Sequence, residues 1–390
     1  MRGRRDPQPS LFYALDVEDR IRPDHPLRPL KAAVDRLLAG LSDRFDAAYS
    51  QTGRPGVPPE RLVKALLLMA LYSVRSERQL IERIDTDLLF RWFLDMSPEE
   101  PAFDATAFAH NRPRLEAHGL TAAFFRAVLG EALTAGLCSE HFSVDGTLIE
   151  SYASLKSVRP IEESEGRAGP PAPAGGPPAD GNGFKPRNPG VDFRGEKRTN
   201  DTHRSTTDPE ARLYRKGAGQ ETKLRHLGHA LGENRHGLIV GVAVTEANGT
   251  AERDAAVDLI DAFRELTGWD PVTVGLDKGY DSGELFLDLE KRGIEPHGAL
   301  TRPPKAEASA LPKERDKVAA RHRMAARATG VGYRLSQRRR KKLEEGFGWL
   351  KEIAGLARSR VVGRWKIQQA WELGAAAYNL VRMRKLLAAG

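Results

Sequence analysis

The sequence predicts an α/β protein, in which a mixed sheet with helices packed on it follows an all-helical N-terminal region. Two patterns and the composition carry this prediction. Apolar residues recur every three or four positions through residues 57–137, whereas after residue 140 short alternating stretches are interleaved with amphipathic ones. The hydrophobic share of 40% is large enough to bury a core, and 390 residues are expected to form two or three domains.

The N-terminal region is predicted to be a series of short helices. Pro58 and Pro59 begin "PERLVKALLLMALYSV", and Ser76 with Gln79 fits a capping box at the start of the next helix. The stretches "TDLLFRWFLDM" and "LTAAFFRAVLGEALTAGL" continue the pattern. Short helices with brief connections suit a helix-turn-helix-like bundle, although many bundles of this kind bind nothing.

Strands and helices alternate after residue 140. "HFSVDG" is predicted to be a short strand with Asp145 at its end, and "KLRHLGHALGE" and "GLIVGVAVT" to be two strands of a hairpin around "NRHG". The remaining predicted elements are, in order, a helix at 252–266, a strand at 271–277, a helix at 282–293 that stops at Gly293, a further strand at 294–300, a basic irregular stretch at 301–330, and helices near 334–356 and 364–388.

An insertion separates the first predicted strand from the hairpin. Residues 168–190 contain 7 Pro and 6 Gly in 23 positions. This composition is typical of a flexible linker. We therefore expect a flexible Pro/Gly-rich insertion at about 155–222, with disorder around residue 175.

Charge and cysteine content exclude several classes of protein. The formal net charge of +8 favours polyanionic partners. Cys138 is the only cysteine, which excludes an internal disulfide and a zinc site built on cysteines. The N-terminus lacks the apolar segment of a secretory signal, and the run "ALLLMALY" is far short of the roughly 20 residues of a membrane span. We expect a cytoplasmic protein without a membrane partner.

Three carboxylates from separate elements suggest a metal centre. Asp145 and Asp277 are each predicted to end a strand, and strand ends in an open α/β sheet form a crevice. Glu344 lies on a late helix that can pack across this crevice. Carboxylate oxygens are the ligands that Mg²⁺ prefers, and two such ions roughly 3.5–4 Å apart can promote an in-line displacement at phosphorus.

Each of these positions also has an ordinary structural explanation. Asp145 precedes Gly146, and Asp-Gly is a common turn pair. Asp277 in "DKGYDS" fits a turn equally well. Glu344 follows Arg340 by four residues, so a surface ion pair explains it adequately.

The position of Glu344 on its predicted helix favours a role as a metal ligand. Given 3.6 residues per turn, Glu344 borders the apolar stripe that includes Leu343 and Phe347, while Glu345 points about 100° further towards water. Residues 334–366 hold 11 Lys and Arg against 3 Glu, so the basic charge of the chain is concentrated here. Trp349 and Trp365 lie among these charges, where packing against the sheet competes with stacking on bases.

These motifs resemble those of insertion-sequence transposases of the DDE class, whose catalytic core is RNase H-like. The resemblance is carried by "FYALDVEDRIRPDHPLRPL", "GRPGVPPERLVKALLLMALY", "FSVDGTLIESYASLKS", "GEKRTNDTHRSTTDPEARLYRKG", "LDKGYDS", "RRRKKLEEGFGWLKEIAGLARSR" and "AAAYNLVRMRKLL". It implies an N-terminal helical, DNA-binding domain at 1–137, a catalytic domain at 138–360 interrupted by the insertion, and a C-terminal helix at 361–390 packing on the core.

The resemblance assigns roles to individual residues. Asp145, Asp277 and Glu344 match the catalytic triad, which implies two Mg²⁺ ions, with Mn²⁺ as a substitute. Arg340 and Lys351 match the arginine four residues before the glutamate and the lysine seven after it, which implies contacts with the phosphates of the cut strand. The family's tyrosine three residues before that arginine is replaced by Gln337, and Tyr333 is out of register. The further candidates for DNA contacts are Arg338, Arg339, Lys341 and Lys278.

The implied activity is DNA transposition: cleavage at the ends of the element, then attack of the freed 3′-hydroxyl on target DNA. The implied partners are double-stranded DNA, both transposon ends and target, and a second copy of the chain on that DNA. A bacterial, nucleoid-associated location follows from the same resemblance. Two alternatives stay open: a metal-dependent DNA endonuclease of the same fold without transposition, and a catalytically decayed DNA-binding protein.

Overall fold

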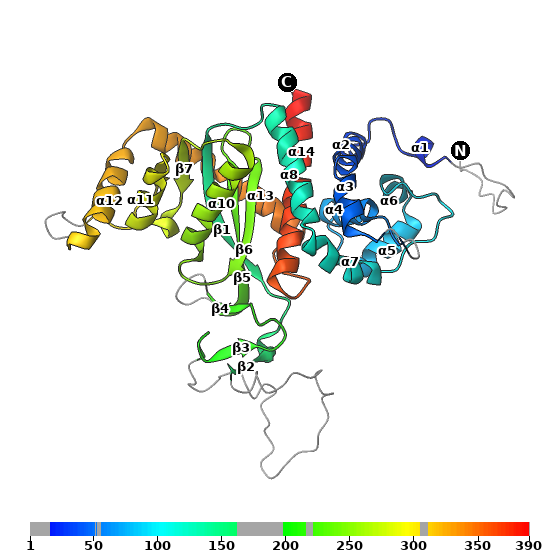
Figure 1. The fold of residues 1–390 in the computed structure, drawn as a ribbon, viewed down its shortest axis with the longest axis horizontal. Coiled ribbons are helices and arrows are strands. Elements are labelled where there is room, and N and C mark those ends of the chain that lie inside the picture. Colours follow the sequence, from blue (N-terminus) through cyan, green and yellow to red (C-terminus); the bar gives the residue numbers. More distant parts are fainter. Residues whose placement is uncertain are drawn as a thin grey trace, which may run out of the picture. The chain divides into compact units, whose positions relative to one another are not determined.

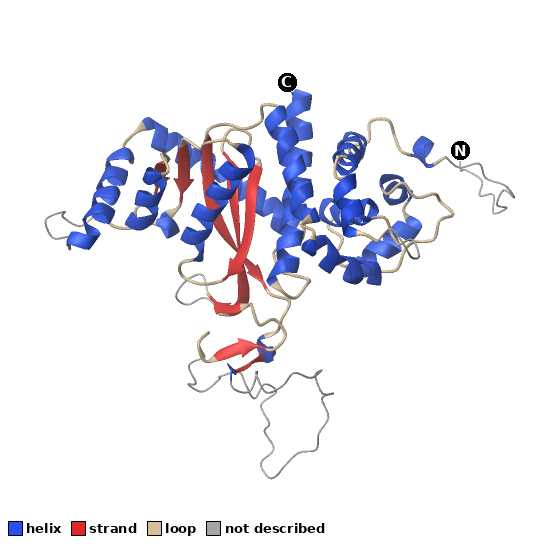
Figure 2. Ribbon diagram, viewed as in Figure 1, coloured by secondary structure: helices blue, strands red, loops and turns tan. Residues whose placement is uncertain are grey.

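The computed structural model describes residues 16–50, 52, 56–161, 198–215, 221–304 and 311–389. The chain divides into two compact units, residues 1–120 and 121–390. Figure 1 names the elements, and Figure 2 shows strands in the second unit alone among the described residues. Each unit is described by itself.

The described part of the first unit is built from helices, as the apolar spacing predicts. These are α1 (Val17–Arg20), α2 (Leu27–Ala39), α3 (Ser42–Ala48), α4 (Pro59–Leu71), α5 (Glu77–Thr86), α6 (Leu88–Phe93) and α7 (Thr106–Ala117). Pro59 begins α4, and the Ser76 hydroxyl accepts a hydrogen bond from the Gln79 N–H at 3.1 Å to cap α5. Leu67, Phe90 and Phe93 are fully buried in this unit.

The helix α8 (Leu120–Thr134) belongs almost entirely to the second unit, although the predicted domain boundary lies at residue 137. The Thr121 hydroxyl donates to Glu372 Oε2 at 2.6 Å, and Glu372 lies on the long C-terminal helix α14 (Arg364–Ala389). In turn, α14 packs on the sheet, where the Asn379 amide bonds both backbone groups of Ile239. None of the helices in the described part of the chain is both long and apolar enough to cross a membrane.

The second unit contains a six-stranded mixed sheet. Its strands are β1 (His141–Glu150), β4 (Arg212–Tyr214), β5 (Lys223–Glu233), β6 (Ile239–Glu246), β7 (Thr273–Leu276) and β8 (Glu295–Gly298). β6, β5 and β1 pair antiparallel, and β1, β7 and β8 pair parallel. Three antiparallel strands, β1, β5 and β6, and two later strands that run parallel to β1 and are reached through helices thus form the predicted mixed sheet.

Helices cover both faces of this sheet. They include α10 (Ala251–Thr267), α11 (Gly283–Lys291), α12 (Arg315–Arg327) and α13 (Val331–Glu352). Because side chains alternate along a strand, Phe142 packs on Phe263 of α10 while the next residue, Ser143, faces α13. A Cβ atom at Gly275 would lie 2.8 Å from Ser143 Oγ and 3.0 Å from Ser336 Oγ of α13, so the absence of a side chain at Gly275 allows this close approach. Figure 1 draws α10 and α13 on different sides of the sheet.

The prediction of an irregular stretch at 301–330 is wrong for its second half. Residues 315–327 form α12, which the short 3₁₀ turn η4 (Pro312–Glu314) precedes. The helix buries two apolar residues, Ala320 and Met324, and charged residues flank both of them in the sequence. Met324 Sδ also accepts the Gly298 N–H of β8 at 3.1 Å. The sequence pattern therefore does not indicate a helix here, and only the packing of these two residues shows it.

The predicted flexible insertion at 155–222 includes ordered elements at both ends. η1 (Leu155–Ser157) leads into β2 (Val158–Pro160), which pairs antiparallel with β3 (His203–Ser205), and β4 joins the main sheet beside β5. The Pro/Gly-rich stretch at 168–190 lies outside the described residues.

A buried polar network anchors the described end of the insertion. Asp208 Oδ2 accepts from the Ser151 hydroxyl at 2.7 Å and lies 2.9 Å from His226 Nε2, and all three side chains are buried. Burial opposes ionisation of Asp208, but the hydrogen bonds from His226 and Ser151 outweigh it and lower its pKa. These two contacts hold the segment before β4 against β5, although Asp208 Oδ1 and His226 Nδ1 have no hydrogen-bond partner among the described residues.

Candidate active site

Asp145 lies in the middle of β1, not at the end of a strand as predicted, because the strand continues to Glu150. Asp277 follows β7, the parallel neighbour of β1. The pairing of β1 with β7 matches His141 to Thr273 and Ser143 to Gly275, and continuing this register by two residues sets Asp145 opposite Asp277. The Asp145 side chain emerges on the face of the sheet that α13 covers, where it contacts Arg340. Asp277 follows the last residue of β7, and its carboxylate accepts the Gly279 N–H at 2.7 Å, which begins the 3₁₀ turn η2 (Lys278–Tyr280).

Glu344 reaches this region through Arg340. Arg340 Nη1 donates to Asp145 Oδ2 at 2.8 Å, and its Nη2 lies 3.0 Å from Glu344 Oε1 one turn further along α13. The guanidinium therefore bridges the two carboxylates. The side chains of Arg340 and Asp145 are 16% and 15% exposed, whereas that of Glu344 is 51% exposed. Glu345 is more exposed, at 64%, and lies 3.9 Å from Arg382 of α14.

Asp145 is buried among charges. Burial is the largest cause that raises its pKa to about 6, and the negative charges of Asp277 and Glu344 add to this effect. The positive charge of Arg340 and the Gly146 N–H act in the opposite direction without cancelling it. The raised pKa of Asp145 therefore reflects its burial first and the neighbouring carboxylates second.

The donor set fits a hard divalent cation, although the described side chains are not gathered around one point. All three candidate ligands are carboxylates, whose oxygens are the ligands that such a cation prefers. Within the described ranges, no group of three acidic, histidine or cysteine side chains is arranged closely enough to hold a metal ion. Glu344 is directed to Arg340, so its carboxylate must turn to join the two aspartates.

Gln337 occupies the position where the family tyrosine is expected. Its amide donates to the backbone carbonyls of Leu276 at 3.1 Å and of His297. It therefore ties α13 to the strand that ends beside Asp277. Tyr333, one turn earlier, lies with its ring 6.0 Å from that of His297. The sequence alone marks Gln337 as a departure, and only the structure shows this contact.

The predicted DNA-contacting residues divide by exposure. Arg338, Arg339, Lys341 and Lys278 are exposed, and Lys351 is half-buried. Arg340 faces the carboxylates instead of the solvent. Trp349 packs on Tyr378 of α14 with ring centroids 5.8 Å apart, in keeping with packing against the protein.

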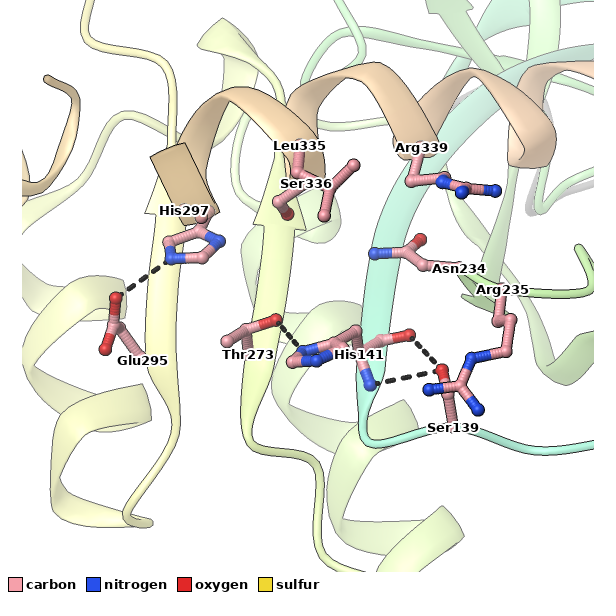
Figure 3. A pocket seen from close by; sticks show the side chains of 11 residues that line it. Ser139, His141, Asn234, Arg235, Thr273, Glu295, His297, Leu335, Ser336 and Arg339 are labelled. Carbon is pink, nitrogen blue, oxygen red and sulfur yellow. Dashed lines mark hydrogen bonds and ion pairs between the residues drawn. The ribbon is translucent and has the colours of Figure 1, made fainter. Parts of the chain in front are cut away.

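A cavity of about 390 Å³ lies under the first half of α13. Its lining includes residues at the starts of β1, β7 and β8, whereas Asp145 lies in the middle of β1 and Asp277 follows the end of β7. Figure 3 shows Asn234, Arg235 and Arg339 at one side and the His297–Glu295 pair at the other. The carboxylate cluster is thus distinct from this cavity, which Arg339 lines.

Two family models match the chain. One, described as a transposase domain (DUF772), matches residues 15–114, and the other, described as a transposase DDE domain, matches residues 197–380. The chain belongs to the DDE-type transposases. This transposase is accordingly an enzyme of polynucleotidyl transfer. The second model includes Asp277 and Glu344, while Asp145 lies before its first matched residue.

Other comparisons add little. No curated protein sequence matches the transposase. A chain from the crystal structure of a pre-cleavage Mos1 transpososome is 13% identical, with 89% of this chain and 86% of that chain covered. The TM-score of that match is 0.21, which is too low to support an argument about the fold.

Proposed function

We propose that this transposase binds the terminal inverted repeats of an insertion sequence and catalyses metal-dependent strand cleavage followed by strand transfer. Asp145, Asp277 and Glu344 are its catalytic carboxylates. One observation carries the assignment: the parallel register of β1 and β7, continued by two residues, sets Asp145 opposite Asp277, and one arginine links Asp145 to Glu344 of the covering helix.

The carboxylates would hold two divalent cations, Mg²⁺ with Mn²⁺ as a substitute. When bound, these ions supply an activated oxygen nucleophile and neutralise charge at the phosphate. Asp145 presents its oxygens from the middle of β1, and Asp277 presents its oxygens from the position directly after β7. Arg340 is a positioning residue, because its guanidinium contacts both Asp145 and Glu344. Half of the Glu344 side chain is exposed, so it is free to turn from Arg340 towards the aspartates.

Exposed basic residues beside this centre would hold DNA. Arg338, Arg339 and Lys341 are exposed on α13, and Lys278 directly follows Asp277. Lys351, two turns after Glu344 on the same helix, is assigned to the phosphates of the cut strand. Such contacts position DNA and make binding depend strongly on salt. The assembly expected on the transposon ends is a homodimer.

The test is the variant Glu344→Gln, which keeps the size of the side chain and removes its charge. Cleavage of an end-containing duplex in Mg²⁺ should be lost, while a gel-shift assay on the same preparation should show unchanged DNA binding. Glu345→Gln is the matched control, since it makes the same change one residue later, on a side chain that faces Arg382. It should cleave normally.

Two results would contradict the proposal. Full cleavage by Glu344→Gln together with loss in Glu345→Gln would move the ligand by one residue. Cleavage by the wild-type chain without joining of the 3′-hydroxyl to added target DNA would establish an endonuclease instead of a transposition enzyme.

A further inference from the structure

We propose that Glu252 is a fourth carboxylate of the cation centre, reaching it from the opposite side of β1. This inference rests on the proposed function, because it assumes that Asp145 and Asp277 bind divalent cations. Glu252 is the second residue of α10, a helix that none of the three predicted ligands occupies.

Two glycines place the Glu252 carboxylate beside Asp277 and beside the residue that follows Asp145. A Cβ atom at Gly146, the residue after Asp145, would lie 2.9 Å from Glu252 Oε1. A Cβ atom at Gly279 would lie 3.0 Å from Asp277 Oδ1 and 3.1 Å from Glu252 Oε2. Asp277 and Glu252 thus flank the same point. A side chain at either glycine would occupy the space into which Glu252 extends.

A buried hydroxyl marks the same region as polar. Tyr280 is fully buried, and its hydroxyl has no hydrogen-bond partner among the described residues. Tyr280 ends the 3₁₀ turn that follows Asp277, and its backbone N–H donates to the Asp277 carbonyl at 3.3 Å. A buried polar atom without a partner is costly, and a cation with its bound water would offer one.

The ordinary explanation of Glu252 is helix stabilisation. Acidic residues in the first turn of a helix interact favourably with its N-terminal partial charge. Asp254 lies in the same first turn of α10 and has the same sign of charge, but it is exposed. If Glu252 only stabilises the helix, variants of Glu252 and Asp254 should affect Mn²⁺ binding equally. If Glu252 belongs to the cation centre, only the Glu252 variant should weaken Mn²⁺ binding.

The experiment measures Mn²⁺ binding by the full chain without DNA, by titration calorimetry and by electron paramagnetic resonance of the free ion. We compare the wild type with Glu252→Gln, Asp254→Asn and Asp145→Asn. Loss of Glu252 as a ligand should raise the Mn²⁺ dissociation constant by about 10-fold or more. Asp254→Asn should bind as the wild type does. Cleavage in Mn²⁺ should fall in Glu252→Gln, with DNA binding retained in a gel shift.

Each outcome separates the two proposals. Wild-type Mn²⁺ affinity in Glu252→Gln, with weakened affinity in Asp145→Asn, would overturn the role of Glu252 and leave the proposed centre standing. Wild-type affinity in both variants would overturn the cation centre itself. An equal loss in Glu252→Gln and Asp254→Asn would assign the effect to general charge or helix stability, and would also refute this inference.

Discussion

Replacing Asp145 with Asn should stabilise the folded chain at neutral pH. Asp145 has its pKa raised from the ordinary value of 3.8 to about 6, chiefly by burial. The folded state therefore resists ionisation that the unfolded state permits. Asparagine keeps the shape of the side chain but carries no charge, so the variant avoids this cost.

The magnitude follows from the two pKa values. A difference of one pKa unit corresponds to about 1.4 kcal/mol, so ionised Asp145 costs the folded state up to roughly 3 kcal/mol. Below pH 4 the group is protonated in both states and the cost vanishes. Between pH 4 and 6 the unfolded state releases its proton first, so the wild type loses stability as pH rises. The advantage of Asp145→Asn should be absent near pH 4 and complete above pH 7.

Thermal unfolding followed by circular dichroism measures this advantage across pH. For a unit of this size, 1 kcal/mol corresponds to about 2–4 °C, so the gain at pH 7.5 should be several degrees. Added Mg²⁺ should raise the melting temperature of the wild type and have a smaller effect on the variant. A melting temperature of Asp145→Asn at or below that of the wild type at pH 7.5 would refute the reasoning. A gain that persists unchanged at pH 4 would refute it equally.

Asp281, four residues after Asp277, is a control for which the same substitution should change stability in the opposite direction. Its carboxylate accepts two hydrogen bonds from Arg321, at 3.0 and 2.9 Å, and two from Thr301. Burial acts to raise its pKa, but these hydrogen bonds outweigh burial and lower it. A lowered pKa contributes stability at neutral pH that is lost as pH falls through the folded value. Asp281→Asn should therefore destabilise at pH 7.5, and its deficit should shrink in acid.

Two further variants test how the site is supported. Gln337→Ala should lower the free energy of unfolding by about 1–3 kcal/mol, because the carbonyls of Leu276 and His297 lose a donor. It should also slow cleavage more than it weakens DNA binding. An unchanged denaturant midpoint would show that the link between Gln337 and these carbonyls is dispensable. Gly275→Ala should lower the free energy of unfolding by about 1–3 kcal/mol, because the added methyl meets Ser143 and Ser336. Gly249→Ala is the control, since its added methyl meets open space and should leave stability nearly unchanged. Equal denaturant midpoints for the two variants would contradict the close packing of α13 on β7.

The sequence alone was sufficient for the order of most elements. Alternation and helical spacing are local properties, and they predicted β1, the β5–β6 hairpin, α10, β7 and α13 with small differences at their ends. They failed at α12, where Ala320 and Met324 carry the buried contacts in an otherwise charged segment. They also missed the pairing of β2 with β3, because a stretch rich in Pro and Gly separates the two strands in the sequence.

For the candidate site, the sequence predicted the strand before Asp277 and the helix that carries Glu344, but it placed Asp145 at the end of a strand that in fact continues to Glu150. Only the tertiary structure decided what each side chain meets. Arg340 contacts Asp145 from a helix 195 residues later in the chain, and Glu252 approaches through space that two glycines leave open. The physical reason is that periodicity encodes the direction of a side chain relative to its own element, whereas its partners depend on strand register and helix packing between elements far apart in the chain.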